Sequence, residues 1–281
     1  MRVFDQLPDL RRQVAQWKQQ GLRVGFVPTM GNLHAGHYSL VELARRHAER
    51  VVASAFVNPT QFGPGEDLSR YPRTPEADEQ GLERAACDAL WRPSADTMYP
   101  YGAAKAVAIR VPGVTDVLEG AHRPGHFDGV ATVVARLFNQ VQPDVAVFGR
   151  KDYQQLAVIR YLVVDLAFPV ELVAAETVRD HDGLALSSRN QYLSTAERTV
   201  APALYATLQG LRDAVRAGAG IGESQARAAR RLANAGFEPD YVVIRRPDLS
   251  EPGDDEAGPL VALAAARLGR TRLIDNLEFE G

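Results

Sequence analysis

The first part of the chain alternates short hydrophobic runs with longer stretches of helical periodicity. The runs are almost wholly apolar and rich in β-branched residues, which is typical of parallel strands buried on both faces. Alternation of strand and helix predicts an α/β fold, a Rossmann-like doubly wound parallel sheet covered by helices. The predicted strands are residues 23–28, 51–57, 89–91, 144–148 and 170–175. The predicted helices are residues 35–49, 75–87, 128–141 and 152–167.

The pattern changes after about residue 176. Ala- and Arg-rich helices are predicted there, followed by strand-like segments, which indicates a second, smaller α+β domain. The helices are 195–217 and 223–235, and the strand-like segments are 241–245, 260–267 and 271–278. We therefore expect one domain at residues 1–176 and another at residues 177–281. The less regular stretch 93–127 predicts loops over the edge of the first sheet.

Composition excludes several classes of protein. The 281 residues are 46% hydrophobic and 24% charged, with 32 Lys and Arg against 35 Asp and Glu. That balance argues against a nucleic-acid-binding protein that works through bulk electrostatics. No apolar run approaches the roughly 18 residues of a membrane helix, and no secretory signal opens the chain. The single cysteine, Cys87, excludes an internal disulfide and a Cys-based zinc site. We expect a cytoplasmic protein without a membrane partner.

The first candidate site is the segment V-P-T-M-G-N-L-H-A-G-H at 27–37, between a predicted strand and a predicted helix. Open α/β sheets bind ligands at this carboxyl edge, and helix N-termini attract phosphate. Gly31 and Gly36 permit close approach of the backbone to a phosphate. His34 and His37 share one face of the first helical turn, where both imidazoles can donate to phosphate oxygens. Capping or packing is the alternative role for these histidines, but their spacing and place favour phosphate handling.

A second candidate segment, F-G-R-K-D-Y-Q-Q at 148–155, again joins a predicted strand to a helix. Lys151 can act as a mobile positive charge on the β- and γ-phosphates or on departing pyrophosphate. Asp152 suits a ribose hydroxyl and equally a helix N-cap. Gln155 can hydrogen-bond a substrate hydroxyl or carboxylate, whereas Arg150 is expected to face solvent.

A third candidate segment at 177–190 lies at the predicted domain boundary and contains Ser187, Ser188 and Arg189. Two hydroxyls and a guanidinium predict a further clamp on phosphates. Either serine can instead cap a turn, so this signal gains weight only from the other two segments.

Two further groups of polar residues suggest recognition of a small substrate. Asn58 and Gln61 carry uncharged amides suited to a polar substrate, although a structural turn around Pro59 explains them about equally well. Glu119 and Arg123 are candidates to bind an amine and a carboxylate.

Together these motifs resemble the pantothenate synthetase family. The resemblance extends over essentially the whole chain and includes F-V-N-P-T-Q-F at 56–62, Y-P-R-T at 71–74, R-P-G-H at 123–126 and R-L-I-D-N at 272–276. His-x-Gly-His alone indicates only the wider nucleotidyltransferase superfamily, whereas the combination of motifs is specific.

The resemblance implies an AMP-forming ligase. Such an enzyme condenses (R)-pantoate with β-alanine and cleaves ATP to AMP and pyrophosphate, through an enzyme-bound pantoyl adenylate. The resemblance also implies Mg²⁺ with the nucleotide, a homodimer, and a role in pantothenate biosynthesis. The smaller domain is then expected to act as a lid, because a pantoyl adenylate must be kept from water.

The resemblance also implies roles for individual residues. The catalytic set is His37 (the proton donor), His34, Lys151, Ser188 and Arg189. The substrate-binding set is Gln61, Gln155 and Asn58, and Asp78 is a neighbour of Mg²⁺. The nucleotide-binding set is Met30, Gly31, Asn32, Leu33, His34, Ala35, Gly36, His37, Gly149, Arg150, Lys151, Asp152, Val178, Leu186, Ser187, Ser188 and Arg189. Arg150 departs from the family, which usually has an acidic or amide residue there.

Two alternatives remain open. One is another His-x-Gly-His nucleotidyltransferase with a different small acceptor, although a phosphorylated acceptor calls for additional cations. The other is a nucleotide-binding regulatory module without turnover, against which the complete set of histidines, lysine and Ser-Ser-Arg argues. A P-loop, a Gly-x-Gly-x-x-Gly turn and a serine nucleophile elbow are all missing from the sequence.

Overall fold

The computed structural model describes residues 1–253, 256 and 258–281. The chain divides into two compact units: Met1–Gly149 with Gln155–Glu176, and Arg150–Gln154 with Thr177–Gly281. Residues 150–154 group with the second unit, although the predicted boundary lies at 176/177. The amide of Asn276 donates to the carbonyl oxygens of Arg150 and Lys151, which attaches this turn to the second unit.

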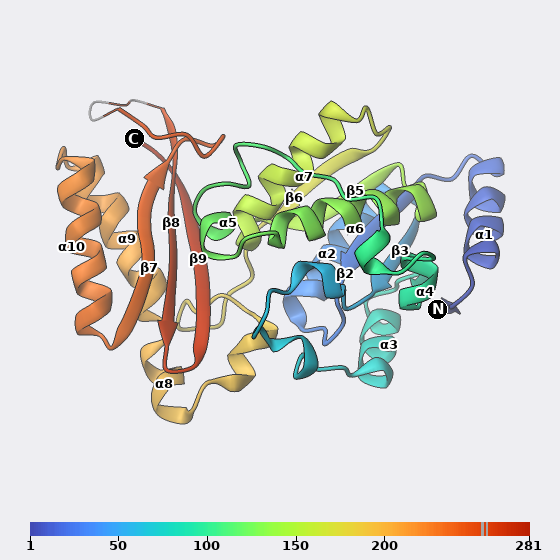
Figure 1. The fold of residues 1–281 in the computed structure, drawn as a ribbon, viewed down its shortest axis with the longest axis horizontal. Helices are drawn as coiled ribbons and strands as arrows, with labels where there is room; N and C mark the ends of the chain where they lie inside the picture. Colours follow the sequence, from blue (N-terminus) through green and yellow to red (C-terminus); the bar gives the residue numbers. More distant parts are fainter. Residues whose placement is uncertain (254–255, 257) are drawn as a thin grey trace. The chain divides into compact units, whose positions relative to one another are not determined.

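The first unit, all of whose residues are described, contains a six-stranded parallel sheet in the order β1-β4-β3-β2-β5-β6. Figure 1 labels its strands β2, β3, β5 and β6. The strands are β1 Arg2–Phe4, β2 Val24–Thr29, β3 Arg50–Ala55, β4 Ala89–Trp91, β5 Val145–Gly149 and β6 Glu171–Ala175. After β2 the chain adds β3 and β4 on one side of β2. After β5, which lies on the other side of β2, it adds β6 at the far edge of the sheet. The direction of winding therefore reverses between β2 and β5, where doubly wound sheets bind ligands.

Side chains of the central strands alternate between two hydrophobic cores, one on each face of this sheet. Phe26, Val52 and Phe148 enter the core formed with α1, α6 and α7. Val27 and Val147 enter the opposite core, formed with α2 and α3. The helices are α1 Leu7–Gln19, α2 Ala35–His47, α3 Pro75–Arg84, α6 His126–Val141 and α7 Tyr153–Asp165. Helices on both faces confirm the predicted doubly wound α/β fold.

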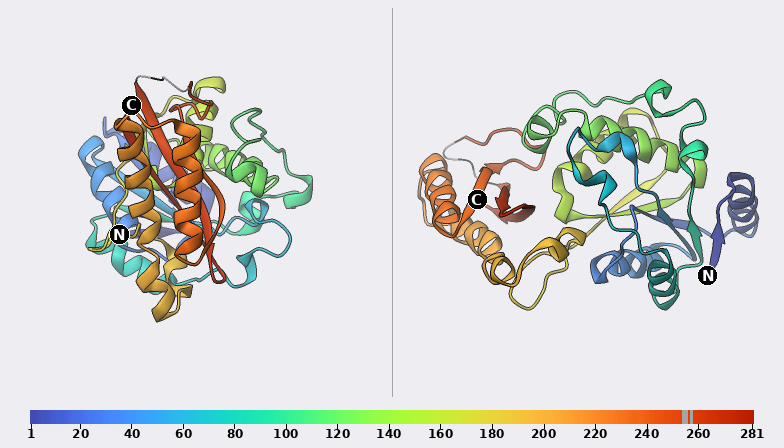
Figure 2. Two further views of the ribbon diagram at one scale, coloured as in Figure 1. Left: turned by 90° about the vertical axis from the view of Figure 1, so that its left-hand side faces the viewer. Right: turned by 60° about the horizontal axis from the view of Figure 1, so that its bottom comes forward.

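The described part of the second unit contains a three-stranded antiparallel sheet in the order β7-β8-β9. The strands are β7 Phe237–Arg245, β8 Pro259–Leu268 and β9 Thr271–Glu280. Helices α9 (Ala203–Arg216) and α10 (Ile221–Asn234) lie side by side and share one core with the strands (Figure 2, left). This arrangement confirms the predicted smaller α+β part of the chain.

Two expectations about elements were incomplete. The pattern missed β1 and α1, because β1 is three residues long and α1 buries only a narrow stripe that includes Leu10, Val14 and Trp17. The single helix predicted at 195–217 is broken into α8 (Thr195–Val200) and α9. Pro202 stands at the break, because its missing N–H and its ring prevent a continuous helix.

The remaining segments form short helices. These are η1 Pro59–Gln61, η2 Asp67–Ser69, α4 Ala95–Met98, η3 Ala103–Lys105, α5 Glu119–His122, η4 Arg150–Asp152 and η5 Ser188–Tyr192. None of the helices among the described residues combines the length and the apolar character needed to span a membrane.

Candidate active site

The segment after β2 turns around a buried carboxylate. Gly31 (φ 82°) and Asn32 (φ 50°) both have left-handed backbone conformations, which point successive N–H groups to one side. Asp78 of α3 accepts hydrogen bonds there from the main-chain N–H of Asn32 (2.9 Å) and of Leu33 (2.8 Å). The Thr74 hydroxyl donates a third hydrogen bond to it at 3.0 Å. The carboxylate thus fixes the loop that leads into His34.

These contacts give Asp78 a structural role, and its expected place beside Mg²⁺ stays a prediction. The residue is only 3% exposed, and both carboxylate oxygens already accept hydrogen bonds from the protein. A magnesium ligand keeps an oxygen open to the ion and its waters. Asp78 therefore serves as the anchor of the loop at 30–37.

Replacing this anchor should disturb the loop without changing the response to magnesium. In Asp78→Asn the new amide nitrogen cannot accept from a main-chain N–H, so we expect a loss of about 1–3 kcal/mol in unfolding free energy. We expect kcat/KM for ATP to fall about tenfold, the rate equivalent of about 1.4 kcal/mol. The Mg²⁺ concentration for half-maximal activity, measured by titration in both proteins, should stay unchanged. A large rise in that concentration would instead restore Asp78 as a metal ligand.

The two histidines of the loop cap the N-terminus of α2 reciprocally. His34 is the N-cap residue, and its Nδ1 accepts from the Gly36 N–H at 3.2 Å. His37 Nδ1 accepts from the His34 N–H at 3.3 Å, and the two ring centroids lie 4.1 Å apart. A main-chain N–H can only donate, so each neutral ring carries its proton on Nε2. Capping is thus compatible with the predicted phosphate handling, because Nδ1 holds the helix and a proton on Nε2 can be donated in a hydrogen bond to an anion.

The predicted substrate amides separate into two roles. Asn58 is 1% exposed, and its Nδ2 donates to the Gly129 carbonyl (3.1 Å) and to Gln61 Oε1 (3.2 Å). Its Oδ1 accepts from the Tyr99 hydroxyl at 2.6 Å and caps η1 through the Thr60 N–H. Because both donors are used inside the protein, Asn58 positions η1 and the expected direct substrate contact is not supported. The alternative, a structural turn around Pro59, describes this residue.

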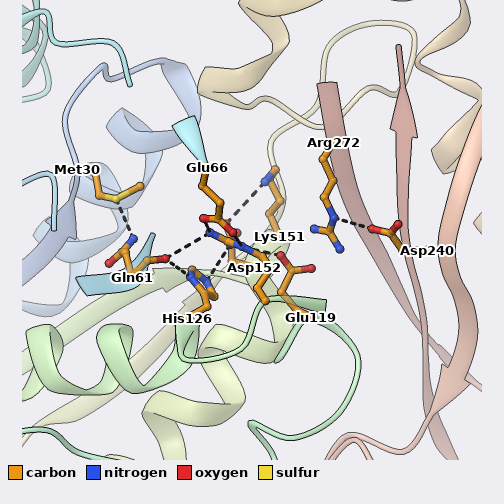
Figure 3. A network of polar contacts seen from close by, with 10 residues as sticks. Met30, Gln61, Glu66, Glu119, His126, Lys151, Asp152, Asp240 and Arg272 are labelled. Carbon is orange, nitrogen blue, oxygen red and sulfur yellow. Dashed lines mark hydrogen bonds and ion pairs between the residues drawn. The ribbon is translucent and has the colours of Figure 1, made fainter. Parts of the chain in front are cut away.

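Gln61, in contrast, is held next to the loop at 30–37. Its Nε2 donates to the Met30 sulfur at 2.9 Å (Figure 3). Its Oε1 accepts from Asn58. An amide carries two donor hydrogens, so one remains beyond the contact with sulfur. The structure therefore brings Gln61 and Met30 together, as a shared site requires.

The suggestion that Glu119 and Arg123 bind an amine and a carboxylate is not supported. The Arg123 guanidinium forms a bidentate pair with Glu66, with Nε–Oε1 and Nη2–Oε2 distances of 2.8 and 2.6 Å. Its Nη1 also donates to Glu119 Oε1 at 3.4 Å. A guanidinium shared between two protein carboxylates is already neutralised, so a substrate carboxylate would have to displace one of them.

His126 lies beside this arginine, and its protonation is unfavourable. Its Nδ1 is 2.8 Å from the Gln61 carbonyl oxygen and its Nε2 is 3.1 Å from Arg123 Nη1. Burial and the neighbouring Arg123 charge lower the pKa of His126 to about 4. The ring is therefore neutral near pH 7, with Nδ1 donating to the carbonyl and Nε2 accepting from the arginine.

This lowered pKa predicts a pH-dependent stability. An unfolded histidine takes up its proton near pH 6.5, whereas folded His126 does so only near pH 4. Between these values the unfolded chain binds more protons, so the unfolding free energy falls as the pH falls. Relative to His126→Asn, the unfolding free energy of the unsubstituted protein should fall by about 3 kcal/mol between pH 7 and pH 4. Urea unfolding of both proteins across this range checks it, and parallel curves would contradict it.

In the second unit, Lys151 sits on a turn fixed by β9. Asn276, 6% exposed, donates to the carbonyl oxygens of Arg150 (2.9 Å) and Lys151 (2.8 Å). The Lys151 ammonium lies 3.7 Å from Asp152. Arg150 pairs with Glu278, so the residue that departs from the family has a protein carboxylate as partner and does not simply face solvent. Asn276 thus holds the main chain of the turn without contacting the Lys151 ammonium.

The predicted segment at 177–190 forms a hairpin that is also attached to β9. The Leu186 N–H donates to the Val178 carbonyl at 3.0 Å. Arg179, within the hairpin, forms a bidentate pair with Asp275 at 2.6 and 2.9 Å. Ser187 accepts from the Arg189 N–H at 3.2 Å and so caps η5, where Ser188 and Arg189 begin the helix. The capping alternative therefore describes Ser187, while Ser188 and Arg189 stay predicted phosphate ligands.

The two units divide the predicted residues between them. The loop at 30–37, Asn58, Gln61, Asp78, Gly149 and Gln155 belong to the first unit, and Gln155 is half-buried on α7. Arg150–Asp152, Val178 and Leu186–Arg189 belong to the second. Sequence reasoning gave no role to His126, Asp275 or Asn276. All three lie in the R-P-G-H and R-L-I-D-N motifs. Polar residues in a family motif to which no ligand had been assigned were the signal that could have found them.

A doubly wound sheet with paired histidines capping the helix after its first central strand defines an α/β protein of the nucleotide-binding class. The sequence profile of the family described as Pantoate-beta-alanine ligase matches residues 2–278. The chain belongs to this family of ligases. It is 64% identical over 279 residues to a Pantothenate synthetase of Xanthomonas axonopodis pv. citri (strain 306), covering 99% of this chain and 100% of the relative. A Pantothenate synthetase of Stenotrophomonas maltophilia (strain K279a) is 63% identical with the same coverage.

Solved structures agree with this assignment. The crystal structure of Pantothenate Synthetase from Thermus thermophilus is 49% identical, with a TM-score of 0.92 and 99% of both chains covered. That of Pantoate-beta-alanine Ligase from Francisella tularensis, complexed with Beta-gamma ATP and Beta-alanine, is 31% identical. Its TM-score is 0.83, with 99% of this chain and 97% of that chain covered. Both likenesses extend over the whole of the described fold.

Proposed function

We propose that the chain condenses (R)-pantoate with β-alanine at the expense of ATP. The observation that carries this proposal is the reciprocal His34–His37 cap after β2, in a loop whose Met30 contacts the Gln61 amide, in a chain of this ligase family. The relative from Francisella tularensis, solved with an ATP compound and β-alanine, supports the same pair of ligands here.

Two steps account for the reaction. A pantoate carboxylate oxygen attacks the α-phosphorus of ATP, and the bond to the bridging oxygen breaks, so that pantoyl adenylate forms and pyrophosphate leaves. The β-alanine amine then attacks the acyl carbon, loses a proton, and displaces AMP. Fixed donors and cations suit the crowded anionic transition state of the first step. Accordingly, His34 and His37 donate hydrogen bonds from Nε2 to phosphate oxygens. Lys151, Ser188 and Arg189 stabilise the negative charge on the departing pyrophosphate.

Binding of the substrates follows from the same assignment. Gln61 and Gln155 hold the hydroxyls and carboxylate of pantoate. The nucleotide lies along Met30–His37, Gly149–Asp152, Val178 and Leu186–Arg189. Magnesium accompanies ATP in this proposal, while Asp78 accepts hydrogen bonds from the main chain of the loop at 30–37 and holds that loop in place.

The test is release of AMP and pyrophosphate from ATP with Mg²⁺, with (R)-pantoate and β-alanine added singly and together. AMP formation that requires both, with pantothenate as product, is expected. AMP formation with another acid or amine would indicate another nucleotidyltransferase, and ATP binding without AMP in any combination would indicate a binding-only module.

We also propose that residues 177–281, which make up most of the second unit, close as a lid when ATP and pantoate bind. The proposed nucleotide ligands come from both units, and an acyl adenylate must be shielded from water. Small-angle scattering is expected to show a smaller radius of gyration with ATP and pantoate than without them. An unchanged radius at saturating ligand would contradict a large closure.

A homodimer and a cytoplasmic location complete the proposal, and both rest on the likeness to the family. Light scattering coupled to gel filtration measures the first, and cell fractionation the second.

A further inference from the structure

A second polar cluster in the first unit is not used by the proposed chemistry. It consists of Glu66, Glu119, Arg123 and His126, and we call it the Gln61 clamp because it surrounds the main chain of that residue (Figure 3). Its side chains are sheltered: that of Arg123 is 15% exposed and that of Glu119 is 9% exposed. Charged groups this far from water are usually paired and hydrogen-bonded, because an unpaired buried charge is costly.

The clamp acts on one atom, the carbonyl oxygen of Gln61. His126 Nδ1 donates to this oxygen at 2.8 Å and Arg123 Nη2 donates to it at 3.4 Å. His126 is oriented in turn by Arg123 Nη1, which donates to its Nε2 at 3.1 Å. Glu66 orients the arginine through two short hydrogen bonds, so the whole chain of contacts ends at the Gln61 backbone.

A second, independent feature fixes the Gln61 backbone: the close approach of α6 at Gly129. A Cβ added to Gly129 of α6 would lie 2.4 Å from the Thr60 carbonyl oxygen and 2.7 Å from Gln61 Cα. Helix α6 therefore packs backbone to backbone against η1, which only glycine permits. Since His126 starts α6, the clamp and this close approach join the same two elements. The side-chain amide of Gln61 is left as the part that faces Met30.

We propose that Arg123 and His126 are positioning residues that set the Gln61 amide for pantoate. This inference rests on the proposed function, in which Gln61 binds that substrate. Arg123 and His126 touch no substrate; they fix the η1 backbone so that the amide is presented in one orientation. Sites held within a fraction of an ångström by supporting hydrogen bonds lose affinity when the support is removed.

His126→Ala and His126→Asn form a matched pair for the test. The asparagine amide nitrogen can take the place of Nδ1 and donate to the Gln61 carbonyl, whereas alanine has no donor. In steady-state assays, His126→Ala should raise KM for pantoate about tenfold, the equivalent of one lost hydrogen bond of about 1.4 kcal/mol. KM for ATP should stay within about twofold, and His126→Asn should restore most of the loss.

A double-mutant cycle with Gln61→Ala separates positioning from general damage. If His126 acts through Gln61, then His126→Ala should change KM for pantoate little once Gln61 is already alanine, so the two effects are not additive. Additive effects, an equal rise in KM for ATP, or a failure of the asparagine to restore KM would overturn the proposal. If His126→Ala does not fold, Glu66→Gln releases Arg123 instead and is put through the same cycle with the same criteria.

Two further outcomes distinguish the positioning role from a direct substrate contact and from a failure of the proposed function. A rise in KM for β-alanine alone in Arg123→Lys would make Arg123 a substrate ligand and overturn the positioning role. If the unsubstituted protein releases no AMP with pantoate and β-alanine, the proposed function fails first. Heat-capacity scans of the free proteins would show whether the clamp still supports the fold in that case.

Discussion

Replacing His37 by alanine is expected to cut kcat about a thousandfold, because in the proposed reaction the ring supplies a donor at the reacting phosphate. The same change removes the acceptor that His37 Nδ1 offers to the His34 N–H. Loss of a helix N-terminal contact costs about 1 kcal/mol, so the variant should remain folded while its unfolding free energy falls by that amount. Steady-state AMP release and urea unfolding measure the two effects separately.

Two conservative variants distinguish the cap from the chemistry. His37→Asn places an acceptor oxygen where Nδ1 stood, so we expect normal stability with kcat as low as in the alanine variant. His37→Gln places an amide nitrogen near the position of Nε2 and should retain part of the activity, since it donates a hydrogen bond but transfers no proton. A kcat near that of the unsubstituted protein in His37→Asn would refute the assigned role.

Lys151→Ala is expected to slow adenylation about a hundredfold to a thousandfold, since a positive charge at departing pyrophosphate is lost. The turn should survive, because Asn276 holds the carbonyl oxygens of Arg150 and Lys151 and not their side chains. The ion pair with Asp152 spans 3.7 Å and joins a half-exposed carboxylate, so its loss should change stability by less than about 0.5 kcal/mol. Single-turnover formation of pantoyl adenylate, followed by rapid quench, measures the step.

Matched variants assign the effect to charge. Lys151→Met keeps most of the length of the side chain without its ammonium and should be as slow as the alanine variant. Lys151→Arg restores a cation in a different geometry and should recover part of the rate. Reaction of preformed pantoyl adenylate with β-alanine should change far less in all three. Equal adenylation rates with and without the lysine would remove it from the catalytic set.

The sequence located the elements of the first unit well, for reasons that are local. Each central strand is a mostly apolar run, rich in β-branched residues, that is buried on both faces. Such a run can be recognised in the sequence without knowledge of the tertiary structure. The helix that begins at Ala35 was predicted at its correct first residue, because the His-x-Gly-His segment carries the cap. The short strand β1 was missed, since three residues that pair with the distant β4 carry no periodicity of their own.

The hydrogen-bond partners of individual polar residues could not be predicted, because they lie far along the chain. Asp78 was expected near a metal, yet it accepts from the N–H groups of residues 45 and 46 positions earlier. Asn58 was expected to touch substrate, yet the Gly129 carbonyl and the Tyr99 hydroxyl, 71 and 41 positions away, use its amide. Residue type and spacing indicate what a side chain can do, and only its partners decide which of these it does.

The fold class, the family and the residue types of the site could all be predicted from the order of the amino acids. Apolar periodicity fixes strands and helices locally, and a series of specific motifs in fixed order has few alternative explanations. The folded chain was needed to establish which nitrogens of His34 and His37 accept, that Asp78 anchors a loop, and that Arg123 and His126 surround the Gln61 carbonyl. Hydrogen bonds are short and directional, so satisfying a buried polar atom depends on groups that folding brings together from distant parts of the chain.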